Sequence, residues 1–302
     1  MGKIVILGVF VADTAYRAER MPNMGETILG NSFALGPGGK GSNQAVAAGR
    51  LGVDVTIISR LGEDDFGQMA LQTWTAANVK GAIKYSPDAY TGAAFIFVDD
   101  RTGDNAIIIS PGAAADISLD DIRENADMIA GADVFLTQLE QPIDVAYEGL
   151  KTAKKNGTTT ILNPAPAAVL PKELFALCDY ITPNETEAEA IAGHPVRNES
   201  EAESAAQTLA QMGVKTPIIT MGEQGAFLFG HGMIPAYNAG PVVETTGAGD
   251  AFNGAFAVAL AEGKSAVDAV RFGCATAAIS VTRPGTAPSM PTRDEVEQLV
   301  SR

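Results

Sequence analysis

One carboxylate, Asp250, stands directly behind three residues with little or no side chain, Gly247, Ala248 and Gly249. The apolar residues 251–260 follow at once, which predicts that a helix begins here. Backbone N–H groups at a helix N-terminus are unpaired and partly positive, and small residues let an anion approach them. The same field favours an ionised Asp250, which could accept a hydroxyl proton during phosphoryl transfer. The alternative interpretation is that Asp250 only caps the helix.

A second stretch, GPGGKGSNQ over residues 36–44, is rich in glycine. It does not match the P-loop, because Gly41 follows Lys40 where Ser or Thr is required. It does match G-x-G-x-x-G, but that dinucleotide fingerprint should follow the first strand immediately, and a long segment intervenes. An NAD-dependent oxidoreductase would rest on this displaced match alone. The stretch is either a flexible turn before a helix or a backbone-lined surface for a polyhydroxyl ligand, with Lys40 and Asn43 as donors.

Three further acids and amides stand where sites are commonly built. Asn184 followed by Glu187, before a helical run, is either a capping box or part of a site. Glu140 follows the apolar run DVFL, so it is either a site residue at a strand end or a solvated loop acid. The chain has two histidines, His194 and His231, each in a loop flanked by Gly or Pro. We therefore expect a carboxylate, rather than a His-based triad, to serve as general base.

Composition narrows the class of protein. The 302 residues are 46% hydrophobic and carry a net charge of −15, so a nucleic acid or an anionic membrane would be repelled. The two cysteines, Cys178 and Cys274, do not form a disulfide framework or a Cys-rich metal site, which favours a cytoplasmic enzyme. The apolar start resembles a short signal peptide, but Asp13 ends it without a convincing cleavage site. No apolar run approaches the roughly 20 residues of a membrane helix.

Apolar β-branched runs alternate with helical patterns, which predicts an α/β domain with a central, mainly parallel sheet. Ligands bind such sheets beyond the carboxyl ends of the strands. Strands are expected at residues 3–13, 53–62 and 158–166, at the start of 179–193, and twice within 216–230. Helices are expected at residues 41–52, 142–157, the end of 179–193, and 200–214.

Two segments interrupt this alternation. Residues 13–35 are polar with weak helix signals, and residues 91–110 read as a hairpin around Asp99–Asp104. We expect them to form a small β lid of residues 13–37 and 91–111. The core would then comprise residues 1–12, 38–90 and 112–302.

Taken together, these stretches resemble the ribokinase family of carbohydrate kinases, also called PfkB-type, and its ribokinase branch in particular. The resemblance covers essentially the whole chain. It rests on five stretches in this order: GGKGSNQAVAAGRLG, NPAPA, ITPNETEAE, GAGDAFNGA and AAISVTRPGTAPS. It implies a Rossmann-like α/β/α sandwich with a β-sheet lid that closes over the sugar and makes a homodimer.

The resemblance also assigns roles to residues. Asp250 would take the proton from the sugar's primary hydroxyl, and the amides of Gly247, Ala248 and Gly249 would form the anion hole for the γ-phosphate of ATP. The sugar would be held by Asp13, Gly39, Lys40, Asn43 and Glu140, with Val11 beside it. Asn184 and Glu187 would serve the phosphates and Mg²⁺, and Thr220, Gly222, Gly225 and Cys274 would line the nucleotide pocket. Activating K⁺ would be bound by Glu244, Thr246, Ser280, Arg283, Gly285 and Ser289, several through backbone carbonyls.

Three positions depart from the family pattern. Val11 stands where ribokinases usually have an Asn that hydrogen-bonds a sugar hydroxyl, and an unpaired hydroxyl there would cost about 1–3 kcal/mol. A sugar without that hydroxyl, such as 2-deoxyribose, would be penalised less. Glu244 replaces the usual Asp at the cation site, which affects the position or selectivity of the ion. Cys274 replaces the frequent His beside the adenine.

The function expected from the sequence is an ATP-dependent, Mg²⁺-requiring kinase of a free pentose, with D-ribose as the first substrate. A kinase of 2-deoxyribose, of another small sugar or of a nucleoside is the alternative with the same mechanism. A catalytically silent sugar or nucleotide sensor is a more remote alternative, because a sensor has no use for a base at Asp250.

Overall fold

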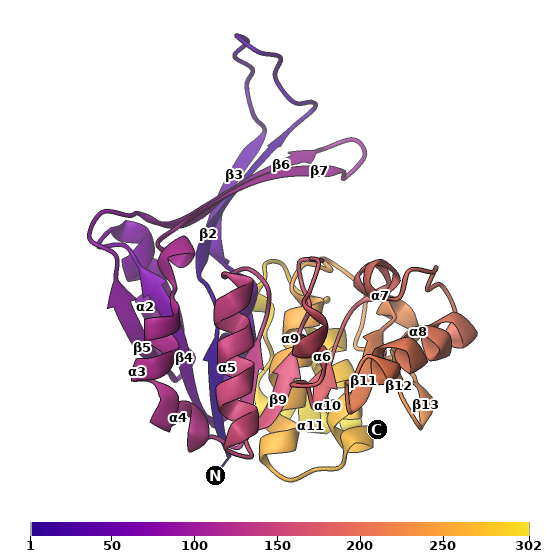
Figure 1. The fold of residues 1–302 in the computed structure, drawn as a ribbon. Helices are drawn as coiled ribbons and strands as arrows, with labels where there is room; N and C mark the ends of the chain where they lie inside the picture. Colours follow the sequence, from indigo (N-terminus) through magenta and orange to yellow (C-terminus); the bar gives the residue numbers. More distant parts are fainter. Residues whose placement is uncertain (1, 302) are drawn as a thin grey trace.

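The structure is a computed structural model that describes residues 2–301. Its larger sheet has nine strands in the order β13-β12-β11-β10-β9-β8-β1-β4-β5 (Figure 1). The strands from β11 to β5 run parallel, and β12 and β13 form an antiparallel edge. The nine strands are β1 (Lys3–Leu7), β4 (Asp54–Leu61), β5 (Val79–Tyr85), β8 (Val134–Thr137), β9 (Thr159–Leu162), β10 (Tyr180–Ile181), β11 (Thr216–Thr220), β12 (Ala226–Leu228) and β13 (Gly232–Ile234).

Helices cover both faces of this sheet (Figure 1). Strand β1 shows the consequence, because Ile4 and Ile6 belong to one buried cluster and Val5 and Leu7 to another. The predicted α/β/α sandwich is therefore confirmed. The α-helices are α1 (Lys40–Arg50), α2 (Asp65–Ala76), α3 (Leu119–Glu124), α4 (Ala126–Ala130), α5 (Ile143–Lys155), α6 (Lys172–Phe175), α7 (Glu185–Ala192), α8 (Glu199–Gln211), α9 (Ala248–Ala261), α10 (Ala266–Ser280) and α11 (Arg293–Val300), and the 3₁₀ turns are η1 (Ala113–Asp116), η2 (Gly222–Gln224) and η3 (Ala287–Ser289).

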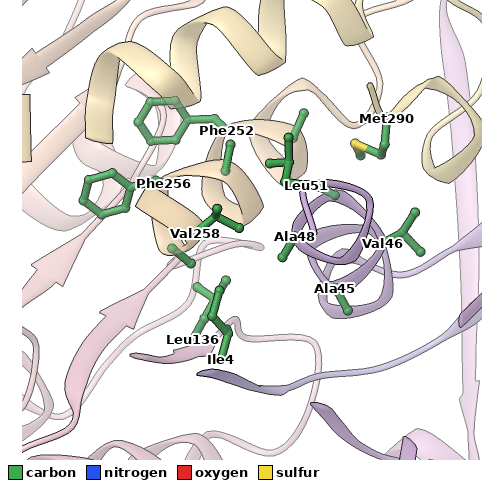
Figure 2. Packing of buried hydrophobic residues seen from close by; sticks show 14 of the residues in the cluster. Ile4, Ala45, Val46, Ala48, Leu51, Leu136, Phe252, Phe256, Val258 and Met290 are labelled. Carbon is green, nitrogen blue, oxygen red and sulfur yellow. The ribbon is translucent and has the colours of Figure 1, made fainter. Parts of the chain in front are cut away.

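Helices α1 and α9 pack closely against each other within the first cluster. Figure 2 shows Ala45 and Ala48 of α1 in the same cluster as Phe252 and Phe256 of α9. A Cβ at Gly254 of α9 would lie 2.6 Å from the carbonyl oxygen of Gln44, so a larger residue would force the two helices apart. Because the helices approach this closely, residues near the start of α1 lie beside the start of α9.

A second sheet of four strands, in the order β3-β2-β6-β7, projects beyond the core (Figure 1). Strands β2 and β6 are parallel, while β3 and β7 pair antiparallel at the edges. The pairing places six large apolar side chains on one face of this sheet, and we call this set the apolar face. It consists of Tyr16, Phe33, Leu35, Phe95, Phe97 and Ile108. The four strands are β2 (Val11–Ala18), β3 (Ser32–Gly38), β6 (Thr91–Asp99) and β7 (Asn105–Gly112).

The prediction of one strand over residues 3–13 was wrong. The chain leaves the larger sheet after Leu7 and enters the second sheet at Val11. The break falls at Gly8, where a Cβ would lie 2.6 Å from the Cα of Gly41 in α1. The apolar pattern continues through the break because residues 9–12 are buried as well, so periodicity alone could not reveal it.

The other predicted elements are confirmed within a few residues at their ends. They include α1, β4, α5, α8 and the hairpin of β6 and β7. Within residues 2–301, the structure contains no helix with the length and apolar character that crossing a membrane requires.

Candidate active site

Seven of the predicted site residues line one cavity at the carboxyl ends of the strands of the larger sheet. Several of the polar residues there directly follow or end a strand, as Asn163 does for β9, Thr182 for β10 and Thr220 for β11. They surround a cavity of about 150 Å³ together with the start of α9. The cavity is lined by Lys40, Asn163, Ala165, Thr182, Asn184, Glu187, Thr220, Gly247, Gly249, Asp250 and Asn253.

A second cavity, of about 260 Å³, lies around the amino ends of β1 and β4. Its lining includes Lys3, Asp54 and Asp127 and none of the predicted site residues. The smaller cavity is therefore the candidate site.

Asp250 is the third residue of α9 and not its cap. The N-cap is Gly247, whose φ of 85° is in the left-handed region. The Asp250 carboxylate accepts hydrogen bonds from Asn43 Nδ2 and Gln44 Nε2, each at 3.0 Å. The interpretation of Asp250 as only a helix cap is therefore wrong, because its oxygens face the side chains of α1 rather than the free N–H groups of its own helix.

The backbone beside Asp250 is open. A Cβ built at Gly249 would have none of the described residues within 4 Å outside its own helix turn. Gly247 and Gly249 both line the cavity. An anion can therefore approach the N–H groups at the start of α9, of which the Ala248 N–H donates to Thr245 O at 3.2 Å in this structure.

Burial raises the pKa of Asp250, while the charge of Lys40 and the hydrogen bonds from Asn43 and Gln44 lower it. The sequence argument considered only the helix terminus, which favours the ionised form; the structure adds desolvation, which opposes it. Burial alone would lower the pKa of Lys40, but the carboxylates of Asp250, Glu140 and Glu187 outweigh burial and raise it. The positive charge of Lys40 therefore interacts with all three carboxylates.

The proposed sugar end of the site contains two acids with unusual pKa values. Burial, with the charges of Asp250 and Glu244, raises the pKa of Asp13 to about 6. Burial also raises the pKa of Glu140, to about 7, although Lys40 opposes the shift. Glu140 Oε2 accepts the backbone N–H of Lys40 at 2.7 Å, so it binds the first turn of α1 and is not a solvated loop acid.

The glycines of residues 36–44 have specific steric roles. A Cβ at Gly38 would lie 2.2 Å from the Asp13 carboxylate, and Gly39 has a φ of 86°. Gly36 and Gly38 belong to β3 of the second sheet and not to a turn directly after β1. A dinucleotide fingerprint requires a turn directly between the first strand and the following helix, and this stretch instead begins in the second sheet. Val11, which pairs with Gly38 at the start of β2, is 5% exposed.

Asn184 and Glu187 form the predicted capping box at the start of α7. Asn184 Oδ1 accepts the Glu187 N–H at 2.8 Å, and Glu187 Oε2 accepts the Asn184 N–H at 3.0 Å. Both residues also line the cavity, so the capping role and a role in the site coexist. Burial raises the pKa of Glu187, against the effect of the Asn184 N–H and of Lys40.

The predicted nucleotide-binding residues are spread around the turn η2 and helix α10. Thr220 lines the cavity, and Gly222 lies in η2. A Cβ at Gly225 would lie 2.1 Å from the carbonyl oxygen of Ile234, so the turn between β11 and β12 requires glycine there. Cys274 is 6% exposed within the first core cluster, where burial raises the pKa of its thiol to about 12.

The residues predicted to bind K⁺ lie on the segment before α9 and around the end of α10. Glu244 Oε2 accepts the Gly285 N–H at 2.8 Å, which joins the two segments. Three further side chains have partners of their own, and Thr246 is exposed. Ser280 donates to Ala277 O, Ser289 donates to Thr286 O, and Arg283 pairs with Glu295.

The side chains around the cavity determine which metal ions the site can hold. Among residues 2–301 there is no group of three or more His, Cys, Asp or Glu side chains placed to hold one ion. Mg²⁺ in phosphoryl-transfer sites is commonly held by one or two carboxylates, waters and the substrate phosphates, and Asn184 and Glu187 at the cavity fit that pattern. For K⁺, the available oxygens are the Glu244 carboxylate, backbone carbonyls and the hydroxyls of Thr246, Ser280 and Ser289, because a hydroxyl that donates to a carbonyl keeps its lone pairs.

Sequence reasoning did not assign a role to four residues of the site. Gln44, Asn163, Thr182 and Asn253 are each at most 7% exposed and hydrogen-bond one another or Asp250. All four occur inside the quoted motifs. The signal available in the sequence was an uncharged polar residue at a strand end or within an apolar helix, where a core side chain is expected.

Residues 1–293 match the family model described as pfkB family carbohydrate kinase. A ribokinase of Haemophilus influenzae is 40% identical over 300 residues, covering 98% of each chain, and a deoxyribokinase of Salmonella typhi is 33% identical over 303 residues, covering 99% of this chain and 98% of the other. The structure of Arabidopsis thaliana ribokinase complexed with ribose and ATP superposes with a TM-score of 0.94 at 32% identity, covering 100% of both chains. The chain therefore belongs to the pfkB family of carbohydrate kinases and is a sugar kinase.

Proposed function

We propose that the protein transfers the γ-phosphate of ATP to the primary hydroxyl of D-ribose, giving D-ribose 5-phosphate and ADP. The observation that carries this proposal is the buried Asp250 carboxylate beside the open N-terminus of α9, with Gly249 exposing the backbone. The similarity to ribokinases over nearly the whole chain supports the choice of sugar class.

The residues of the site divide the chemistry as follows. Asp250 accepts the proton as the sugar O–H bond breaks, the sugar oxygen bonds to the γ-phosphorus, and the bond from phosphorus to the bridging oxygen breaks to release ADP. The N–H groups of residues 247–249 donate to the phosphoryl oxygens where negative charge develops. A base works best when its pKa lies near the operating pH, so the upward shift in the pKa of Asp250 serves this step.

Lys40, Asn43, Asp13, Gly39 and Glu140 would hold the sugar. Asn184 and Glu187 would hold Mg²⁺, which neutralises phosphate charge when bound. Thr220, Gly222, Gly225 and Cys274 would line the nucleotide pocket. We place the enzyme in the cytoplasm, where its ATP is available.

A second candidate substrate is 2-deoxy-D-ribose, and Val11 is the observation that favours it. An apolar side chain there cannot pair with a sugar hydroxyl, and deoxyribokinases are among the relatives at 33% identity. The test is ADP release with Mg-ATP and K⁺ for D-ribose and 2-deoxy-D-ribose side by side, in the wild type and in Val11→Asn. Stronger turnover of ribose supports the first candidate, and turnover of the deoxy sugar alone supports the second. If no free sugar causes ADP release, both candidates are contradicted.

Val11→Asn should raise the ratio of kcat/KM for ribose over 2-deoxyribose by about tenfold, because an amide restores a partner for the extra hydroxyl. An unchanged ratio would show that Val11 does not face that hydroxyl. Thermal unfolding of the variant is the control, because Val11 is also packed in the second core cluster.

The second sheet is proposed to act as a lid formed by residues 13–37 and 91–111, closing over the sugar and pairing with a second copy of the chain. Its apolar face supports this, because Phe33 and Ile108 are 56% and 64% exposed. Large exposed apolar patches commonly mark an interface.

K⁺ is proposed as an activating ion bound between the segments that Glu244 and Gly285 join. Activity in K⁺ should exceed activity in Li⁺ at equal ionic strength, and equal activity in the two salts would contradict the site.

A further inference from the structure

A chain of buried amides ends on the Asp250 carboxylate. Gln44 is fully buried on α1, and its Nε2 donates to Asp250 Oδ1 and to Asn163 Oδ1, both at 3.0 Å. An amide nitrogen carries two hydrogens, so this geometry uses both of them. Both hydrogens of Gln44 Nε2 are therefore used by these two acceptors.

The direction of the Gln44 amide is set by groups behind it. Asn163 Nδ2 donates to the backbone carbonyl of Thr182 at 3.2 Å. A backbone carbonyl can only accept, so Asn163 must present its oxygen to Gln44. Gln138 Nε2 in turn donates to Gln44 Oε1 at 2.5 Å. Reversing the Gln44 amide would place oxygen against oxygen at Asn163 and at Asp250, and nitrogen against nitrogen at Gln138.

The same chain returns to the proposed phosphate cradle. Thr182 Oγ1 donates to Asn253 Oδ1 at 2.6 Å, and Asn253 Nδ2 donates to the carbonyl of Gly249 at 2.8 Å. Gly249 is the residue before Asp250. The network thus joins the base and the backbone beside it through one set of bonds.

We propose that Gln44 is a positioning residue, which fixes the orientation of the Asp250 carboxylate and stabilises its ionised form through a donor whose direction Asn163 sets. This rests on the proposed function, in which Asp250 is the base. Asn43 also donates to Asp250. Gln44 is fully buried and lies outside the described lining of the cavity, so it acts through Asp250 and not on the substrate.

Besides the hydrogen bond from Gln44, several charged groups act on Asp250. They come from β2, α1, the segment after β8, and α7, and they are Asp13, Lys40, Glu140 and Glu187. Burial raises the pKa of Asp250, whereas Lys40 and the bonds from Asn43 and Gln44 lower it. Removing the Gln44 donor leaves the other groups in place and should move the pKa of Asp250 upward.

The test is the pH dependence of kcat/KM with D-ribose for Gln44→Met and Gln44→Glu. Gln44→Met removes the donor at similar volume, so the acid limb should move up by about one pH unit. Gln44→Glu places a second carboxyl group against Asp250, so its acid limb should lie higher still. Since Asp13 and Glu140 also titrate in this range, the measured quantity is the shift relative to the wild type.

The matched control is Gln141→Met. Gln141 is a buried glutamine that donates to Thr137 Oγ1 and to Gln138 O, one step removed from Gln44. It should lose thermal stability and keep the wild-type acid limb. If the acid limb of kcat/KM lies at the same pH in the Gln141→Met control and in both Gln44 variants, the proposal is overturned and Gln44 is a structural residue.

Two further outcomes are decisive. If Gln44→Met does not fold, Gln44→Glu decides the question alone, because it preserves length and polarity. Its acid limb should then lie at a higher pH than that of the wild type. Asp250→Asn separates this proposal from the proposed function. Retained turnover in Asp250→Asn overturns the proposed function, whereas an inactive Asp250→Asn with unmoved limbs in the Gln44 variants overturns only the role of Gln44.

Discussion

At the floor of the candidate site, polar side chains such as Gln44 and Asn163 are buried and paired with one another, while on the second sheet apolar side chains such as Phe33 and Ile108 face solvent. The first arrangement holds groups in single orientations, because an unpaired buried amide costs free energy. The second arrangement leaves apolar area that another surface could cover. The first region therefore holds its side chains in fixed positions, whereas the second leaves an apolar surface open.

One contact between the two regions lies beside the start of α9. Thr286 Oγ1 donates to the carbonyl of Pro37 in β3 at 2.9 Å, so the loop after α10 contacts the base of the second sheet. Gly247 lies against the same residue, since a Cβ there would be 3.2 Å from the Thr286 Cα. The base of the second sheet is thereby anchored beside the start of α9.

Apart from replacing Asp250 itself, the largest expected effect comes from filling the cradle on the rigid side. In Gly249→Val, the side chain would extend into the space beside the first N–H groups of α9. The kcat/KM should fall at least about 100-fold, because the phosphate loses these donors. The melting temperature should change little, because the substituted side chain meets open space. A loss of stability with normal kcat/KM in the folded fraction would contradict the cradle.

A smaller effect is expected from the pH dependence of stability in Glu140→Gln. Burial raises the pKa of Glu140 to about 7, so the folded chain keeps a proton that the unfolded chain releases near 4.5. The contribution of Glu140 to stability is therefore greatest below pH 4.5 and falls as the pH rises through 7. Gln does not titrate and can still accept the Lys40 N–H.

Chemical unfolding at about pH 5 and pH 8 measures this effect. The stability of Glu140→Gln relative to the wild type should rise by on the order of 2 kcal/mol between the two pH values, after allowance for the partial exposure of the group. A difference that is constant with pH would show that Glu140 is ionised in both states.

The smallest effect is expected on the second sheet. Ile108→Lys places a charge on the apolar face, whereas Ile107→Lys places the same charge on the opposite face of the same strand. If the apolar face pairs with a second copy, Ile108→Lys should weaken association about tenfold in sedimentation equilibrium, and Ile107→Lys should not. Equal association in both variants would mean that this face does not form the contact.

How much of this was predictable from the sequence differs between the two regions. The alternation of apolar runs and helical patterns predicted the α/β core, and Asp99–Asp104 marked the hairpin of the second sheet. The break at Gly8 was not predictable, because it depends on the contact with Gly41, a residue distant in sequence and close in space. Local patterns report whether a side chain is buried and do not report which sheet buries it.

For the site, the sequence singled out the charged residues together with Asn43, Asn184 and Thr220, and it missed four neutral residues, Gln44, Asn163, Thr182 and Asn253. Asp250, Glu140 and Lys40 stand out because charge is unusual beside apolar strands. Gln44 and Asn253 lie in helices and look like ordinary polar residues until α1 and α9 pack together. The upward shift in the pKa of Asp250 was missed for the same reason, since desolvation comes from elements that fold over it and not from its own helix.

The central claim is that Asp250 is the base of a sugar kinase, and Asp250→Asn tests it most directly. The measurement is ADP formation with D-ribose, 2-deoxy-D-ribose and Mg-ATP, alongside ATP binding by calorimetry, for the wild type and the variant. We predict that kcat falls by about 1,000-fold or more while ATP affinity stays within a few-fold, because Asn keeps the shape and loses the proton acceptor. Turnover near the wild-type rate in Asp250→Asn would contradict the account.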